Sequence, residues 1–221
     1  MQSIKDTIKN INIVIGCNIG CSYCYARMNN NRFHTIDDFN KPVFFENKLK
    51  MLNNKRHTAY LLTGQSDLSG WNEEWKDKVF SKMKENENTQ YIFLTKRPEN
   101  INLKETPDNG WFGVTVTSSK EKTRIDYLRN NIKAKHYHIT FEPMFDDVGK
   151  LDLSNISWIV IGTETGNRKG KISSKREWVF NIYNQAKEKN IPVFMKEDLL
   201  GILKEDEVVQ EFPKEFGGIE W

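Results

Sequence analysis

The chain has few cysteines, no long apolar run and little net charge. Its 221 residues include 33 Lys and Arg against 30 Asp and Glu, so the net charge is only +3 and the strongly basic composition of many nucleic-acid-binding proteins is missing. No apolar stretch approaches the roughly 20 residues that cross a bilayer, and the first residues lack the basic-then-apolar order of a secretion signal. No linker rich in Pro, Gly and Ser divides the chain. We therefore expect a cytoplasmic protein without membrane contact, with one domain over residues 1–221 in which 201–221 form a C-terminal extension.

The only cysteines are Cys17, Cys21 and Cys24, in a C-x3-C-x2-C spacing after an apolar run. An odd number of cysteines packed this closely cannot form a disulfide framework, and a reducing cytosol does not favour one. Three thiolates on one loop suit a cubane iron–sulfur cluster in which one iron has no protein ligand. A structural zinc site of three cysteines with His34 as the fourth ligand is the competing interpretation.

Short apolar and β-branched runs alternate with helical patterns, which predicts repeated strand–helix units and a parallel sheet. The candidate strands are residues 11–15, 59–63, 91–95, 112–117, 136–141, 158–162 and 192–195. One helix is expected around residues 75–83, and two more after Ser118 and Ser174, each of which is followed three residues later by a glutamate as in a capping box. The pattern predicts an α/β fold, a partial or nearly closed parallel (β/α) barrel of six to seven strands.

Polar residues follow most of these strands. Because helical crossovers bring the C-terminal ends of parallel strands to one rim, we expect these residues to be neighbours beside the cysteine loop. Glu142 and Glu164 would point at this rim, where they either grip polar groups of a substrate or cofactor or pair with cations such as Lys96, Arg97 or Lys196. Lys96 and Arg97 are also candidates to hold a phosphate or carboxylate.

The cysteine spacing, with Tyr23 immediately before the third cysteine and the loop placed after a strand, resembles the radical S-adenosylmethionine superfamily. The superfamily signature is this spacing with an aromatic residue at that position. Further segments are similar to an uncharacterised, often phage-encoded group within it, namely residues 94–98, 111–116, 141–144, 158–166 and 193–196. The resemblance covers most of the chain and implies a barrel of the radical S-adenosylmethionine type.

The resemblance implies that the three cysteines hold a [4Fe–4S] cluster whose free iron binds the amino and carboxylate groups of S-adenosylmethionine. An electron from an external donor such as flavodoxin or ferredoxin would then yield a 5′-deoxyadenosyl radical that abstracts hydrogen from a substrate. The implied cofactor-binding residues are Tyr23, Thr63, Gly64, Gln65, Thr115, Thr117 and Ser118. Gln65 departs from the superfamily's Gly-Gly-Glu-like turn, because it lacks the negative charge. The candidate catalytic residues are Glu142, Glu164 and Lys196.

The sequence leaves other functions open. One is a metal-binding barrel, with zinc or a structural iron–sulfur cluster, that recognises a nucleic acid or a protein without catalysis. Another is a radical enzyme acting on nucleic acid, with a phosphate-facing surface of Lys96, Arg97, Arg168, Lys169 and Lys171. The substrate is thus a small molecule or an exposed part of a nucleic acid or protein. The chain end from Gly217 to Trp221 either packs as a tail or covers the barrel mouth.

Overall fold

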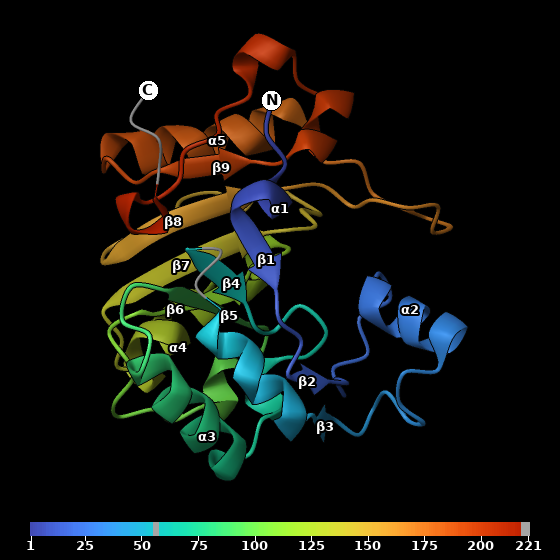
Figure 1. The fold of residues 1–221 in the computed structure, drawn as a ribbon. Coiled ribbons are helices and arrows are strands. Elements are labelled where there is room, and N and C mark those ends of the chain that lie inside the picture. The colour runs from blue at the N-terminus through green and yellow to red at the C-terminus, as the bar shows by residue number, and fades with distance from the viewer. Residues whose placement is uncertain (55–57, 218–221) are drawn as a thin grey trace.

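A curled sheet of seven parallel strands forms the centre of the computed structural model, which describes residues 1–54 and 58–217 (Figure 1). The strand order is β1-β4-β5-β6-β7-β8-β9. The bounds are β1 (Ile8–Asn10), β4 (Ala59–Leu61), β5 (Gln90–Thr95), β6 (Gly110–Thr115), β7 (His136–Phe141), β8 (Ile156–Ile161) and β9 (Val193–Met195). Every neighbouring pair is parallel, which makes the fold an α/β half-barrel.

Helices cover the outer, convex face of this sheet. The main ones are α3 (Glu73–Lys84), α4 (Thr123–Asn131) and α5 (Arg176–Glu188). Their apolar faces pack with the sheet in one large core cluster, which includes the fully buried Val79 of α3, Leu128 of α4 and Ile182 of α5. Complete burial of such a side chain contributes about 1.5–3 kcal/mol. None of the helices within the described ranges is long and apolar enough to cross a membrane.

The C-terminal segment packs against the inner, concave face of the sheet. The ring of Phe216 lies edge-on to Trp111 and Trp158, at centroid distances of 4.7 and 5.3 Å. Both tryptophans lie near the beginnings of their strands, so this segment covers the end of the half-barrel opposite the strand C-termini. The hydroxyl of Thr58, just before β4, donates to the carbonyl of Phe216 over 2.7 Å. The part of the chain around Phe216 is therefore packed against the sheet, and Gly218 to Trp221 of the alternative lid lie outside the described residues.

The expected strand over residues 11–15 is replaced by two short strands. β1 ends at Asn10, and β2 (Val14–Ile15) pairs antiparallel with β3 (Val43–Phe44) in a separate small sheet. The polar Asn12 separates the two, and the amide of Phe45 donates to the carbonyl of Ile13 over 2.8 Å. The amide of Ile11 still donates to the carbonyl of Leu61 on β4 over 3.0 Å, so only Val14 and Ile15 of the predicted strand belong to the separate sheet.

Helices α1 (Ile4–Thr7) and α2 (Tyr25–Phe33) were not predicted, and the two expected capping boxes are wrong. α4 begins at Thr123, after a short 3-10 turn, and Ser118 makes no capping hydrogen bond. α5 begins at Arg176, and the hydroxyl of Ser174 instead donates to the carbonyl of Met144 over 3.1 Å. At Ser174 a long-range partner replaces the local pairing, whereas the carboxylate of Glu121 accepts hydrogen bonds from the nearby Thr117.

Candidate metal and cofactor site

The cysteine loop, residues 16–24, is attached to the end of β4. The amide of Gly16 donates to the carbonyl of Gln65 over 3.0 Å, and Gly16 forms an isolated parallel bridge with Ser66. The hydroxyl of Tyr25, immediately after the loop, donates to the carbonyl of Gly64 over 2.5 Å. These contacts fix the loop at the rim formed by the C-terminal ends of the parallel strands, which we call the barrel mouth.

All three cysteines are free and half-buried. Cys24 is the N-cap of α2, and its Sγ accepts a hydrogen bond from the amide of Arg27 over 3.4 Å. Burial raises the pKa of Cys17 to about 11, and negative charge on Asp67, Cys21 and Cys24 acts in the same direction. The thiols are thus close enough to oppose one another's ionisation. Three thiolates on this loop require compensating positive charge, which bound metal ions supply.

No three His, Cys, Asp or Glu side chains within residues 1–54 and 58–217 are placed to share one metal ion. Tetrahedral zinc requires four ligand atoms at about 2.0–2.3 Å from a single ion. The Cys3His arrangement with His34, which lies at the other end of α2 as its C-cap, is therefore not preformed. A cubane makes a different demand, since each thiolate binds a separate iron. The donor set of three half-buried thiols on one loop suits that chemistry.

One wall of the mouth carries an ion pair between Glu142, after β7, and Lys196, after β9. The pair lies across Gly162, after β8, where a Cβ atom would be 3.0 Å from Lys196 Cδ and 3.2 Å from Glu142 Cδ. A second carboxylate, Asp198, has its Oδ2 3.5 Å from Lys196 Nζ. Burial would lower the pKa of Lys196, but the two carboxylates outweigh it and raise that pKa. Lys196 is therefore a fixed cation and not a base at neutral pH.

This ion pair lies near the cysteine loop. Burial is the main cause that raises the pKa of Tyr25. Negative charge on Glu142 and Cys24 raises it further, whereas the positive charge of Lys196 lowers it, so all three groups lie near this hydroxyl. Glu164 is placed differently, because Arg168 holds its buried carboxylate through two hydrogen bonds of 2.5 and 2.8 Å. The structure thus unites two of the three candidate catalytic residues and gives Glu164 a partner in its own loop.

The other wall carries Lys96, which follows β5. Its Nζ lies 3.4 Å from Thr115 Oγ1 and 5.8 Å from the ring centre of Tyr23. The Tyr23 ring also packs edge-on against Phe145, at a centroid distance of 5.4 Å. Among the described residues, no carboxylate lies within ion-pair distance of Lys96 or of the neighbouring Arg97. Lys96 is therefore a half-buried ammonium group that can still receive an anion.

Several predicted cofactor-binding residues have structural partners. The Thr63 hydroxyl accepts from the amide of Leu94 over 2.7 Å. The amide and hydroxyl of Thr117 both donate to Glu121 Oε2, over 2.8 and 2.6 Å, and the Ser118 carbonyl accepts from the amide of Glu121. These groups shape the turns after β4 and β6, and the hydroxyls of Thr63 and Thr117 are not fully free for a ribose.

Asn12 is a site residue that the sequence analysis missed. A Cβ atom on Gly64 would lie 3.0 Å from Asn12 Oδ1, and this buried oxygen has no hydrogen-bond partner among the described residues. A buried acceptor without a donor is costly, so the position is complementary to a ligand that brings an N–H group. An Asn inside an apolar run was the available signal. Arg27 was missed too, because only the folded chain brings its side chain to the cysteine loop.

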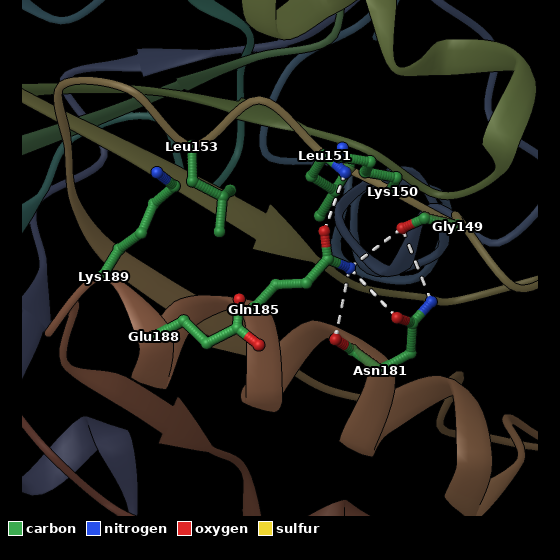
Figure 2. Close-up of a pocket in the computed structure, with 8 residues that line it drawn as sticks. All are labelled: Gly149, Lys150, Leu151, Leu153, Asn181, Gln185, Glu188 and Lys189. Atoms are coloured by element: carbon green, nitrogen blue, oxygen red, sulfur yellow. Dashed lines mark hydrogen bonds between the residues drawn. The ribbon is translucent and has the colours of Figure 1, made fainter.

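A hollow beside α5 is unrelated to this site (Figure 2). Its polar groups satisfy one another: the Gln185 side-chain amide donates to the carbonyl of Gly149 over 3.0 Å, and its oxygen accepts from the amide of Leu151 over 2.8 Å. None of the predicted site residues lines it. We assign this hollow no role.

The fold and the site define the class of this protein: an α/β half-barrel with a three-cysteine loop at its mouth. Residues 2–218 match the family described as protein of unknown function (DUF5131), and the chain belongs to that family. No curated protein matches the chain, and no solved structure matches it.

Proposed function

We propose that the protein is a cytoplasmic radical S-adenosylmethionine enzyme that holds a [4Fe–4S] cluster through Cys17, Cys21 and Cys24. The observation that carries the proposal is the attachment of a loop with three free, half-buried cysteines to the mouth of a parallel half-barrel. When bound, the cluster and S-adenosylmethionine supply an electron and a cleavable C–S bond, and hence a 5′-deoxyadenosyl radical that takes hydrogen from the substrate. The electron comes from an external donor such as flavodoxin or ferredoxin.

The residues around the loop supply complementary groups for an amino acid moiety. Asn12 Oδ1, beside Gly64, would accept a hydrogen bond from the cofactor's amino group and so compensate for the charge that Gln65 lacks. Lys96 would hold a carboxylate or phosphate of the cofactor or the substrate. Tyr23, whose ring lies between Phe145 and Lys96, shields this position from water.

On the opposite wall, Glu142 and Lys196 would contact the substrate. Lys196 stays protonated, so it acts as a hydrogen-bond donor and not as a general base. Glu142 forms an ion pair with Lys196, so the pair offers the substrate both a hydrogen-bond donor, the ammonium group, and a hydrogen-bond acceptor, the carboxylate. Glu164 stays a predicted catalytic residue, with Arg168 holding its carboxylate. The substrate is a small molecule or an exposed part of a larger one that fits between these walls.

The test is anaerobic reconstitution with iron and sulfide, followed by reduction in the presence of S-adenosylmethionine. We expect about four irons and four sulfides per chain, visible iron–sulfur absorption, and formation of 5′-deoxyadenosine. A Cys21→Ala variant should lose the product, whereas Ser22→Ala, at an exposed position of the same loop, should keep it. Bound zinc without sulfide, or normal 5′-deoxyadenosine formation by Cys21→Ala, would refute the proposal.

A further inference from the structure

Arg27 joins the two ends of the cysteine loop. It is the third residue of α2, and its Nη2 donates to the carbonyl of Cys17 over 2.8 Å, while its own amide donates to Cys24 Sγ over 3.4 Å. The guanidinium carbon lies 5.0 Å from the ring centre of Phe39, whose carbonyl accepts from the amide of Cys17 over 2.7 Å. The side chain is therefore held against the loop by stacking and by a hydrogen bond.

The charge of Arg27 is not neutralised by a neighbouring carboxylate. Within residues 1–54 and 58–217 no Asp or Glu oxygen lies at ion-pair distance from its guanidinium, and the first turn of α2 contains no acidic residue. The guanidinium group of an arginine is a permanent positive charge in proteins. A half-buried cation without an anionic partner thus stands beside three cysteines that would each bind metal as an anion.

We propose that Arg27 is a positioning residue that raises the reduction potential of the cluster held by Cys17, Cys21 and Cys24. This inference rests on the proposed function. Reduction adds one negative charge to the cluster, so a fixed positive charge beside the loop stabilises the reduced form more than the oxidised form. The reduction potentials of such clusters depend on net charge, hydrogen bonds and solvent exposure. Arg27 acts through its positive charge.

The experiment is a redox titration of the reconstituted full-length protein, followed by electron paramagnetic resonance in the absence of S-adenosylmethionine. Arg27→Gln removes the charge, Arg27→Lys keeps it, and both leave the amide that donates to Cys24 in place. Arg32→Gln is the matched control, because Arg32 belongs to the same helix but is exposed and lies over Phe33, 5.1 Å from its ring centre.

We expect Arg27→Gln to reduce the equilibrium constant for one-electron reduction about tenfold, which is a potential about 59 mV more negative. Arg27→Lys should retain most of the wild-type potential, and Arg32→Gln all of it. If Arg27→Gln cannot hold the cluster, the test rests on Arg27→Lys. An Arg27→Lys protein that holds a cluster with nearly the wild-type reduction potential supports the proposal.

The proposal is overturned if Arg27→Gln binds the normal amount of iron at an unchanged potential. It is also overturned if Arg27→Lys loses the cluster or shifts as far as the glutamine variant, since charge would then not be the cause. A wild-type protein that binds no iron and sulfide would instead refute the proposed function, so the two failures are distinguishable.

Discussion

Acid should unfold this protein partly through one buried histidine. His138, on β7, is 1% exposed, and its Nε2 lies 3.0 Å from the carbonyl oxygen of Phe93. Its ring occupies the space above Gly113 of the neighbouring strand, where a Cβ atom would be only 2.4 Å away. Burial lowers the pKa of His138 to about 4, from 6.5 in an exposed histidine.

The effect on stability follows from these two pKa values. Above pH 6.5 the imidazole is neutral in both the folded and the unfolded chain, so it adds no pH dependence. Between pH 6.5 and about 4 the unfolded chain binds a proton that the folded chain refuses, and stability falls as the pH falls. The gap of about 2.5 between the pKa values corresponds to ~3 kcal/mol. That is a large fraction of the roughly 5–15 kcal/mol that stabilises a typical domain.

The assay is urea denaturation of metal-free wild-type protein and of His138→Gln, at several pH values between about 7 and 4. Glutamine keeps a donor for the Phe93 carbonyl but does not titrate in this range. We expect the wild-type free energy of unfolding to drop, relative to the variant, by ~3 kcal/mol across that interval. A difference between the two proteins that stays constant with pH would refute the reasoning, because other titrating groups are common to both.

Other substitutions test the mouth and the tail. Gly162→Ala should displace the Lys196 and Glu142 side chains by a few tenths of an ångström and destabilise the protein by ~1 kcal/mol in urea, and an unchanged midpoint would contradict the close contact. Phe216→Ala should cost ~3–5 kcal/mol, because it empties a fully buried position between two tryptophans; thermal unfolding near the wild-type temperature would show that the tail does not pack there. Lys96→Gln should weaken S-adenosylmethionine binding about tenfold by calorimetry, whereas the exposed Lys120→Gln should not; equal affinities would remove Lys96 from the site.

The sheet could be predicted from the sequence because burial on both faces leaves a strong local pattern. β5 is an almost continuous apolar run, β7 is buried from Tyr137 to Phe141, and both coincide with predicted strands to within a residue. The apolar run before the cysteines led to a wrong strand assignment. Residues 11–15 have the composition of a buried strand, but composition does not show which sheet the strand joins. The capping boxes failed for a related reason: spacing shows that Ser174 can reach Glu177, but not that Met144 competes for its hydroxyl.

The side-chain pairings of the site could not be predicted. Glu142 and Lys196 are 54 residues apart, and only the curvature of the sheet and the absence of a side chain at Gly162 bring them together. Glu164 has a similar position after its strand, yet it pairs with Arg168 four residues later. Strand ends identify which residues reach the rim, but the choice among several partners of opposite charge depends on distances that sequence spacing does not contain.

Satisfied and unsatisfied groups at the mouth have different roles. Thr63 and Thr117 direct their hydroxyls into backbone or carboxylate partners, so they hold the turns in shape. Among the described residues, Asn12 Oδ1 receives no hydrogen bond, and the Lys96 ammonium has no ion-pair partner. Because such groups are costly when buried alone, they are the places where a ligand gains most on binding. An acceptor near the end of β4 and a cation after β5 together match a ligand that carries an ammonium group and a carboxylate.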